Sequence, residues 1–327
     1  MSGLLTAFRL RWQRRRHLWR AFRHRRELRL VAGDPASIDR LDILVFCTLR
    51  NEIARLPGFL AHHRALGVRR FLIVDNASTD GSADFLADQG DVILWRAEAS
   101  YRLARFGMDW INHLLARYGQ GHWCLTLDAD ERLVYPYWQT RPLSALTEWL
   151  ESQGREAFGA MMLDLYPKGP LSAGGGLEWF DAGNYVIQRK PGLNCLWLQG
   201  GPRARAFFAD KPRQAPTLTK IPLVRWHWRY AYHNATHSLL PPRLNAVYDK
   251  GELTSGLLLH DKFRPLVLDK SAEEKFRRAH FGRPEDFDPY YDSLIADPEL
   301  WHPHSTRLTG SWRQLEALGL MSRGGWV

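Results

Sequence analysis

Four short apolar runs, separated by stretches with helical periodicity, limit the folds open to this chain. The runs cover residues 43–48, 71–74, 92–95 and 123–127. Runs of this length and composition predict strands that are buried on both faces. Helices are expected at residues 56–66, 83–88, 102–118 and, near the end of the chain, 312–318. Strands that alternate with helices predict an α/β fold, with a Rossmann-like, mostly parallel sheet flanked by helices.

Polar side chains follow three of these runs, at the point where each expected strand ends. Arg50-Asn51-Glu52 follows the first run, Asp75-Asn76 opens the turn after the second, and Asp128-Ala129-Asp130-Glu131 follows the fourth. The carboxyl ends of parallel strands meet at one edge of a sheet, so these turns predict a single ligand-binding cleft. The sequence contains neither a Gly-x-Gly-x-x-Gly after the first run nor a Gly-Lys-Ser/Thr loop, so it predicts neither a dinucleotide-binding nor a P-loop protein.

The acidic turn after the fourth run predicts a cation site. Asp128 and Asp130 are one residue apart, so both can bind one cation and leave its other positions to phosphate oxygens and water. A solvated acidic turn is the alternative. Asp286-Phe287-Asp288 has the same spacing, but it follows Arg283-Pro284-Glu285 instead of an apolar strand. We therefore expect the cation at Asp128 and Asp130.

The positive charge of the chain is concentrated at its start. Residues 1–30 contain ten arginines and one acid, Glu27, and so carry +9 of the formal net charge of +10. The nearly neutral remainder does not favour a nucleic-acid-binding domain. Four aromatic residues fall on one stripe of the helix expected here, namely Phe8, Trp12, Trp19 and Phe22. Such a helix can lie on an anionic membrane surface, and a disordered arm or an RNA-binding tail are the alternatives.

This contrast in charge suggests the domain organisation. Residues 1–32 are expected to form a basic helix or arm, residues 33–37 a turn or linker, and residues 41–327 one domain. The domain would have a regular half, 41–135, and a less regular half, 136–327, that binds the acceptor and ends in helices.

The cysteines and the hydropathy indicate the compartment. Cys47, Cys124 and Cys195 are far apart in the chain and form no metal-spaced pair, which indicates a reducing environment. The longest apolar runs fall well short of the roughly 18 residues that span a bilayer, and the arginine-rich start leads into no secretory signal. We expect a cytoplasmic protein, or one that is peripheral on the inner face of the cytoplasmic membrane.

Taken together, the three motifs carry a resemblance to a known family. An apolar strand followed by Asn51-Glu52, a second ending in Asp75-Asn76-x-Ser78-x-Asp80-Gly81-Ser82, and a later one ending in Asp128-Ala129-Asp130 resemble family-2-type bacterial glycosyltransferases of the GT-A fold. The resemblance covers residues 41–135 and weakens beyond them. It implies a metal-dependent, inverting transfer of a sugar from a nucleotide-diphosphate donor, expected to be a UDP-sugar, to an acceptor hydroxyl.

The resemblance also implies roles for individual residues. Asp128 and Asp130 would hold Mn²⁺ or Mg²⁺ on the donor diphosphate, Asp75 would contact the uracil or ribose, and Glu52 would line the nucleotide pocket. The remaining positions expected in the nucleotide-sugar site are Thr48, Arg50, Asn51, Asn76 and Ala129. From the residues alone, Glu52 could instead cap the following helix. Ser78 and Asp80 could stabilise a glycine turn instead of contacting a ligand.

In the second half, His260 and one glycine-rich segment stand out. His260 ends an apolar run, and the resemblance implies that a late histidine completes the metal shell or contacts phosphate; a core-packed histidine is the alternative. Gly200-Gly201-Pro202-Arg203-x-Arg205 is expected to be a loop whose arginines contact phosphate or acceptor hydroxyls, or a surface turn with solvated arginines. His233 and His237 have i, i+4 spacing but no adjoining glutamate, so no zinc site is predicted.

An inverting transfer needs a base close to the acceptor hydroxyl and near, but not on, the metal. Asp164 is the first candidate because it follows the apolar run at 160–163, beyond the metal motif. Asp181 is the second candidate and His237 the third.

Two other functions stay open at this stage. A sugar-phosphate nucleotidyltransferase shares the sheet and the metal, but such an enzyme usually carries a glycine-rich Arg/Lys signature after the first strand, and Arg50-Asn51-Glu52 does not match it. A non-catalytic nucleotide-sugar-binding protein of the same fold is the other possibility. For a glycosyltransferase, the expected acceptor is a glycan or a lipid-linked sugar in bacterial surface polysaccharide synthesis.

Overall fold

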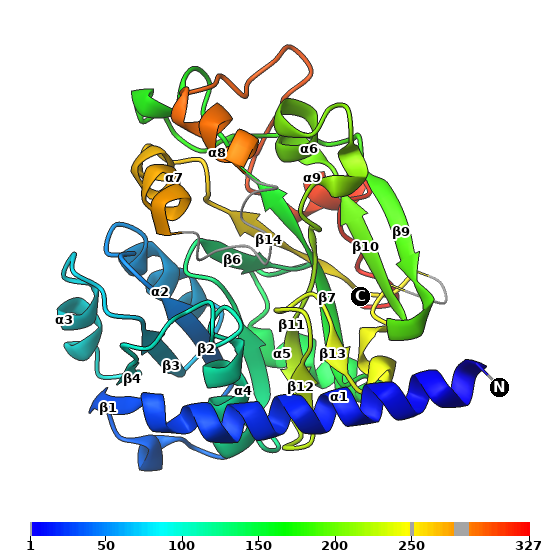
Figure 1. Cartoon of the computed structure of the whole chain (residues 1–327). Coiled ribbons are helices and arrows are strands. Elements are labelled where there is room, and N and C mark those ends of the chain that lie inside the picture. The colour runs from blue at the N-terminus through cyan, green and yellow to red at the C-terminus, as the bar shows by residue number, and fades with distance from the viewer. Residues whose placement is uncertain (1, 249–251, 278–287) are drawn as a thin grey trace.

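The computed structural model describes residues 2–248, 252–277 and 288–327. Its central feature, within these ranges, is a nine-stranded sheet in the order β1-β4-β3-β2-β5-β11-β7-β14-β6 (Figure 1). In that order the strands are β1 (Arg29–Ala32), β4 (Val92–Arg96), β3 (Arg70–Asp75), β2 (Leu44–Leu49), β5 (Trp123–Thr126), β11 (Thr219–Arg225), β7 (Ala157–Asp164), β14 (Gly256–His260) and β6 (Glu131–Val134).

Most of these strands point the same way. Strands β4, β3, β2 and β5 are mutually parallel. Strand β11 is antiparallel to both β5 and β7, so β7 and its parallel neighbour β14 run in the direction of β5. Only β1, β11 and β6 among the nine described strands run the other way. The predicted α/β fold, with a mostly parallel sheet flanked by helices, is confirmed.

Alternation along β2 shows why both faces of the sheet are covered. Val45 and Cys47 pack in one apolar cluster with helices α2 (Leu56–Ala65) and α5 (Leu143–Ser152). Leu44 and Phe46 pack in a second cluster with α4 (Met108–Tyr118). Successive side chains of a strand point to opposite faces, so a run that is apolar at every position needs a helix layer on each side. The short helix α3 (Ser82–Ala87) connects β3 to β4.

The segment before α4 differs from the prediction. The helix begins at Met108, whereas the periodicity predicted helix from residue 102. Arg105 and Phe106 have positive φ values of 53° and 58°, and Gly107 has φ 75°. These left-handed conformations cannot continue a right-handed helix. A Cβ on Gly107 would lie 2.9 Å from Cγ2 of Thr48, so the turn approaches the end of β2 closely.

The basic start of the chain is one helix that packs on the domain. Helix α1 (Ser2–His24) lies along one edge of the molecule, against α4 (Figure 1). It is shorter than the predicted thirty residues, because residues 29–32 form β1 and pair with β4. None of the helices in the described ranges combines the length and apolar character that a membrane span requires.

The remaining elements build the second half of the domain. They are β8 (Trp179–Phe180), β9 (Val186–Lys190), β10 (Cys195–Gln199), α6 (Gly201–Phe207), β12 (Ala231–Tyr232), β13 (Leu239–Leu240), α7 (Leu266–Arg277), α8 (Asp288–Ile295), β15 (Thr306–Arg307) and α9 (Trp312–Ala317). The prediction of a loop over residues 200–205 was wrong, because α6 begins at Gly201 with Pro202 in its first turn. Proline is favoured there because its missing N–H would have no partner in any case. Asp286 and Phe287 lie outside the described residues.

Candidate functional site

A pocket of about 480 Å³ opens at the carboxyl ends of the parallel strands. The turn after β2 contributes Thr48, Arg50 and Glu52, the turn after β5 contributes Asp128, Ala129 and Asp130, and β14 contributes its last residue, His260. The sheet therefore brings the predicted turns to one cavity. Met108 of α4 and Phe106 before it line the same pocket, so the left-handed turn at residues 105–107 shapes one of its walls.

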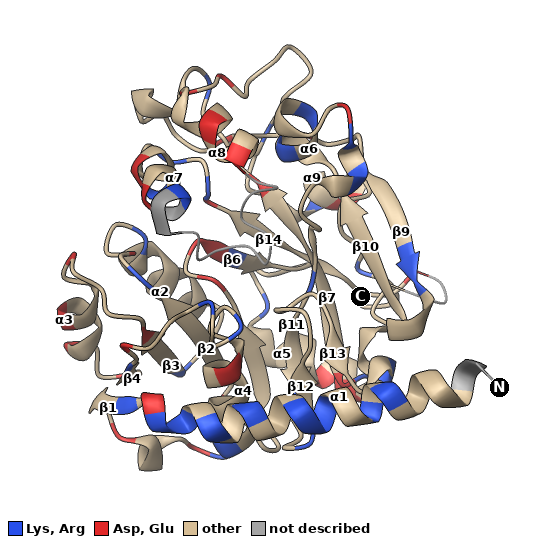
Figure 2. Cartoon of the chain, in the orientation of Figure 1, with Lys and Arg blue, Asp and Glu red and all other residues tan. Residues whose placement is uncertain are grey.

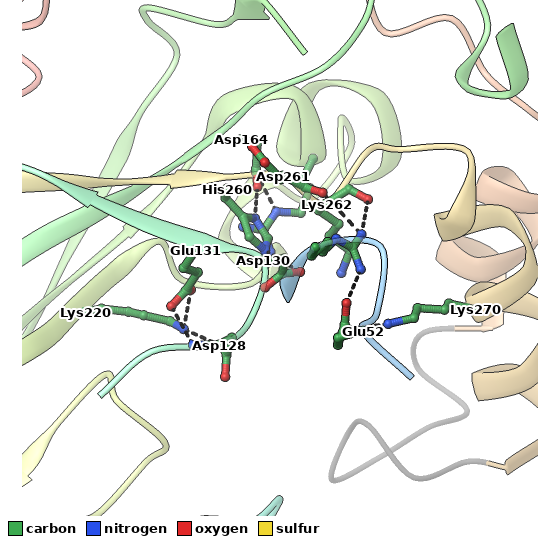
Figure 3. A network of polar contacts seen from close by, with 12 residues as sticks. Glu52, Asp128, Asp130, Glu131, Asp164, Lys220, His260, Asp261, Lys262 and Lys270 are labelled. Carbon is green, nitrogen blue, oxygen red and sulfur yellow. Dashed lines mark hydrogen bonds and ion pairs between the residues drawn. The ribbon is translucent and has the colours of Figure 1, made fainter. Parts of the chain in front are cut away.

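Asp128 is paired with a buried lysine that comes from β11. The Lys220 Nζ lies 2.7 Å from Asp128 Oδ2 and 2.5 Å from Glu131 Oε1 (Figure 3). The lysine side chain is 4% exposed, whereas that of Asp128 is 57% exposed. Burial alone would lower the pKa of Lys220, but the carboxylates of Asp128 and Glu131 raise it above its ordinary value. Lys220 is therefore a fixed positive charge beside the Asp-x-Asp turn.

His260 connects the second aspartate of the turn to Asp164. Its Nε2 lies 3.3 Å from Asp130 Oδ2, and its Nδ1 lies 2.6 Å from Asp164 Oδ1 (Figure 3). The parallel pairing of β14 with β7 places His260 directly opposite Asp164. Burial lowers the pKa of His260, but the two carboxylates offset this and raise it to about 9. His260 is therefore not a core-packed histidine but part of a polar chain that faces the pocket.

These donors suit a hard divalent cation that keeps ligands from water and phosphate. A carboxylate on one ring nitrogen of a histidine fixes the tautomer and turns the other nitrogen toward a metal. Asp164 makes this contact with Nδ1, so Nε2 faces Asp130. Across the described ranges, no group of three or more His, Cys, Asp or Glu side chains could hold a metal by itself. Asp130, with Asp128 nearby, therefore fits a cation of the Mg²⁺ kind that binds one or two carboxylates together with substrate phosphates. Because the pKa of His260 is raised, a cation at its Nε2 would displace the proton there.

Glu52 lines the pocket as predicted and does not cap the following helix. It accepts a hydrogen bond from Arg55 Nη1 at 2.6 Å and pairs with Lys270 of α7. Arg55 also donates to the carbonyl oxygens of Asp261 and Lys262, which follow β14. The turn after β2 is thus tied to the turn after β14, and Arg50, Lys262 and Lys270 add positive charge to the lining of the pocket.

The turn after β3 is built by its own polar side chains. The Asp75 carboxylate is buried and accepts the Ser78 N–H at 3.1 Å, and Asn51 accepts the Thr79 N–H at 2.8 Å. Asp80 accepts N–H groups of Ile53 and Ser82, which agrees with a turn-stabilising role. Asn76, unlike Asp75 and Asn51, lines the pocket. Contact of Asp75 and Asn51 with a nucleotide stays a prediction.

The first two candidates for the base are both buried in ion pairs. Asp164 binds His260 and also accepts a hydrogen bond from Arg203 Nε at 2.7 Å. Burial raises the pKa of this carboxyl, but the Arg203 guanidinium and His260 outweigh it and hold the pKa well below its usual range. Asp181 accepts hydrogen bonds from the Tyr166 hydroxyl and from Arg205 Nε, and it is not part of the pocket lining. These contacts suit structural and positioning roles.

His237, the third candidate, lines the pocket. Its Nδ1 lies 2.6 Å from the carbonyl oxygen of Thr219, which can only accept, so Nδ1 carries the proton and Nε2 keeps its lone pair. Burial, and then the charge of Lys220, lower its pKa to about 4. His237 is therefore neutral near pH 7 and can accept a hydrogen bond from a hydroxyl group.

The two arginines of α6 have different environments. Arg203 is buried and lines the pocket, and its Nη2 has no hydrogen-bond partner among the described residues. A buried guanidinium donor without a partner is costly, so an anion in the pocket would satisfy it. Arg205 pairs with Asp181 instead, outside the pocket. Gly200, which precedes the helix, approaches Tyr185 too closely for a side chain: a Cβ would lie 2.4 Å from Tyr185 Cδ1.

The sequence analysis did not assign five charged residues to the site, namely Arg55, Lys220, Lys262, Lys270 and Glu273. Lys220 carried a usable signal, because it interrupts the apolar run of a strand and such a charge needs buried partners. Arg55 lies three residues after Glu52, a spacing at which opposite charges can meet.

No protein-family model and no curated protein sequence matches the chain. Solved structures match with low similarity, and two of them serve as examples. One, described as a glucose-1-phosphate thymidylyltransferase from Bacillus anthracis in complex with a sucrose, is 9% identical over 75% of this chain and 99% of that chain, with a TM-score of 0.35. The other, a UDP-glucose pyrophosphorylase from Acinetobacter baumanii, is 11% identical over 78% and 99%, with a TM-score of 0.31. Both belong to the nucleotidyltransferase class, but similarity at this level does not bear on the function of this chain.

Proposed function

We propose that the chain is a glycosyltransferase that moves a sugar from a nucleotide-diphosphate donor, with UDP as the expected nucleotide, to an acceptor hydroxyl. The observation that carries the proposal is the chain of contacts Asp164–His260–Asp130 at the floor of the pocket. These contacts orient an imidazole and a carboxylate where the parallel strands end, beside Arg203, whose Nη2 has no hydrogen-bond partner among the described residues.

Different residues of the pocket would have different roles in such a transfer. Asp130 and His260 would hold a divalent cation, Mn²⁺ or Mg²⁺, which neutralises diphosphate charge as the leaving group departs. Arg203, Lys262 and Lys270 provide further positive charge for the phosphates. Lys220 holds Asp128 in place through their ion pair.

For proton removal from the acceptor, we favour His237 over Asp164 and Asp181. It lines the pocket and keeps a free lone pair on Nε2, whereas both aspartates are bound by arginines. A base must lie within hydrogen-bonding reach of the hydroxyl that it deprotonates, and of the three candidates His237 alone is in the lining of the pocket. A direct displacement of the leaving group, assisted by this one base, would invert the anomeric carbon.

The second candidate function is a sugar-phosphate nucleotidyltransferase, the class of the two solved structures described above. The connection from β2 to α2 argues against it. Residues 50–55 read Arg-Asn-Glu-Ile-Ala-Arg and contain no glycine, so they lack the glycine-rich phosphate loop that such enzymes usually carry. This connection instead presents the Glu52 carboxylate to the pocket. A non-catalytic binding protein would not need the free lone pair of His237.

The experiment that separates these functions is a product assay with Mn²⁺. The protein is incubated with a panel of UDP-sugars, and in parallel with nucleoside triphosphates plus sugar 1-phosphates. We expect release of UDP from a UDP-sugar and no pyrophosphate in the second series. Pyrophosphate release would assign the nucleotidyltransferase function, and the absence of both products together with tight UDP-sugar binding would assign a binding protein. The Asp130→Asn variant is the control for background hydrolysis.

We further propose a glycan or lipid-linked acceptor in bacterial surface polysaccharide synthesis, and a location at an anionic membrane surface. The arginine-rich helix α1 supports the location, since basic helices are attracted to anionic lipids.

A further inference from the structure

Helix α1 is fixed to the domain by one of its faces. Leu10 and Ala21 are buried against the domain, and Arg20 Nε donates to the buried carboxylate of Asp109 at 2.9 Å. His17 Nε2 lies 2.9 Å from His233 Nδ1 on the loop after β12. The helix therefore presents a defined opposite face to the surroundings.

The opposite face is apolar. It carries six large side chains, each at least half exposed, with Trp12 at 55% and Leu4 at 82% as the extremes. They are Leu4, Leu5, Phe8, Trp12, Trp19 and Phe22. At 100° per residue these six positions fall within one stripe of about 100° that lies opposite Leu10 and Ala21. Single exposed hydrophobic residues are ordinary, but a continuous stripe of this kind marks a surface that contacts another apolar phase.

Arginines border this stripe, and most have no carboxylate partner. The helix contains seven arginines and no acidic residue, and in the described ranges Arg20 is the one among them that pairs with a carboxylate. Figure 2 shows the basic residues repeated along α1, except at its N-terminal end. The pKa of Arg14 is lowered by burial and by the charges of Arg15, Arg229 and Arg11, so positive charge here is not neutralised within the chain. An anionic partner would relieve this repulsion.

A groove runs between α1 and two proline-containing turns. Its volume is about 680 Å³, and Leu10, Pro191 and Pro241 are among the apolar residues that line it. Arg11 and Arg14 of α1 line it as well. A groove with apolar walls and two guanidinium groups matches a lipid, whose acyl chain is apolar and whose phosphate accepts charge-assisted hydrogen bonds.

We propose that α1 and this groove form a docking surface for an anionic phospholipid bilayer. The aromatic stripe lies in the bilayer interface, where tryptophan is favoured. The groove lies on the domain side of the helix, where Leu10 faces, and it takes up one phospholipid drawn out of that interface, with its phosphate at Arg11 and Arg14. The inference deepens the proposed membrane location, but it does not depend on the proposed glycosyl transfer. RNA would use the arginines without the apolar stripe, and a second copy of this basic helix would be repelled by the first.

Docking on this surface would bring the pocket near the membrane. Arg20 Nη2 donates to the carbonyl oxygen of Leu103 at 2.7 Å, and Arg105 Nη2 donates to that of His233 at 2.5 Å. Tyr101, Phe106 and Asn234, which line the pocket, lie in these same two segments. The helix therefore supports one wall of the pocket, and a lipid-linked acceptor could reach that wall from the bilayer.

The test is sedimentation of the full-length protein with vesicles of phosphatidylcholine and phosphatidylglycerol at 7:3, compared with vesicles of pure phosphatidylcholine. Two double variants probe the surface: Trp12→Ser with Trp19→Ser for the stripe, and Arg11→Gln with Arg14→Gln for the groove. The matched controls are Leu41→Ser and the pair Arg40→Gln with Arg69→Gln, all exposed positions outside α1. Circular dichroism and a thermal melt confirm that each variant is folded.

We expect binding to the anionic vesicles that weakens with added salt, at least tenfold weaker binding for each α1 variant, and unchanged binding for the controls. Equal binding of the α1 variants and the wild type, or no preference for anionic vesicles, would overturn the inference. The inference would also be overturned if light scattering showed a dimer of the wild type that is lost in the Trp12/Trp19 double variant, or if the protein bound RNA more tightly than vesicles. Calorimetric titration of the same variants with UDP separates the two proposals. Lost vesicle binding with intact UDP binding concerns this surface alone. Lost UDP binding with intact vesicle binding concerns the proposed transfer alone.

Discussion

Asp164 and His260 lie opposite each other on the parallel strands β7 and β14, with Oδ1 and Nδ1 2.6 Å apart. This contact fixes which nitrogen of the imidazole faces Asp130 and the pocket. It changes the role that we assign to Asp164. Sequence position made this residue the first candidate for the base, but its partners make it the residue that orients a ligand of the proposed metal.

The Asp164→Asn variant distinguishes these roles. An asparagine removes the charge that holds His260, so we expect Mn²⁺-dependent UDP affinity to fall by about 10- to 100-fold. Isothermal titration calorimetry with UDP and Mn²⁺ measures this directly. If UDP binding stays intact while transfer is lost, Asp164 is the base after all. Asp181→Asn is the matched control, because this buried carboxylate lies outside the pocket lining, and its variant should bind UDP normally.

Removing the charge of Lys220 should destabilise the protein strongly. The Lys220→Met variant leaves Glu131 buried without its cation and leaves Asp128 without its partner. Breaking a buried ion pair from one side typically costs about 3–5 kcal/mol of unfolding free energy. Urea denaturation measures this cost. Arg225→Met on the same strand is the control, since its pair with Glu151 is exposed and should contribute about 1 kcal/mol or less. A similar small loss for Lys220→Met would contradict the ion-pair geometry.

The contact between α1 and α4 should depend on Arg20. This arginine pairs with the fully buried carboxylate of Asp109, which Arg105 also contacts at 3.3 Å. We expect Arg20→Ala to lower the unfolding free energy by about 1–3 kcal/mol, because a buried carboxylate loses a charged donor. Limited proteolysis should then cut α1 faster than in the wild type. Arg23→Ala, an exposed neighbour on the same helix, should change neither quantity.

His63 should make the protein less stable in acid. It is fully buried, its Nδ1 contacts the Phe59 carbonyl oxygen at 2.8 Å, and its Nε2 accepts the Leu133 N–H at 3.4 Å, so only the neutral ring fits. Burial, followed by repulsion from His62, lowers its pKa to about 3. Because the folded-state pKa lies below the ordinary value near 6.5, the unfolded state binds the proton first, and stability falls as pH drops below about 6.5.

The variant His63→Gln isolates this contribution. Between pH 6 and pH 4, the unfolding free energy of the wild type should fall by up to about 1.4 kcal/mol more per pH unit than that of this variant. Urea denaturation of both proteins at several pH values in this range gives the difference. Parallel stability profiles would show that the folded protein accommodates a protonated His63.

The sequence predicted the regular half of the fold because local patterns determine it. The runs that became β2, β3, β4 and β5 are apolar at nearly every position, and only strands with a helix layer on each face bury them. The meeting of the turns after β2 and β5 at one cavity followed from their place at one edge of the sheet, whereas the position of His260 beside Asp130 was expected from the family resemblance. The predicted start of α4 was wrong because the hydrophobic periodicity does not show that Arg105 and Phe106 adopt left-handed conformations.

The residues that the sequence did not reveal depend on pairings between distant segments. Lys220 reaches Asp128 because β11 inserts antiparallel between β5 and β7, a register that periodicity does not determine. The arginine partners of Asp164 and Asp181 come from α6, which was expected to be a loop. Gly201 and Pro202 could have indicated that helix, because proline is favoured in the first turn.

The most direct test of the central claim is a calorimetric titration of the purified protein with UDP, with and without Mn²⁺. We predict binding that requires Mn²⁺ and is lost in Asp130→Asn, because Asp130 and His260 face each other in the lining of the pocket. UDP binding that is equally tight without Mn²⁺, or unchanged in Asp130→Asn, would contradict the central claim.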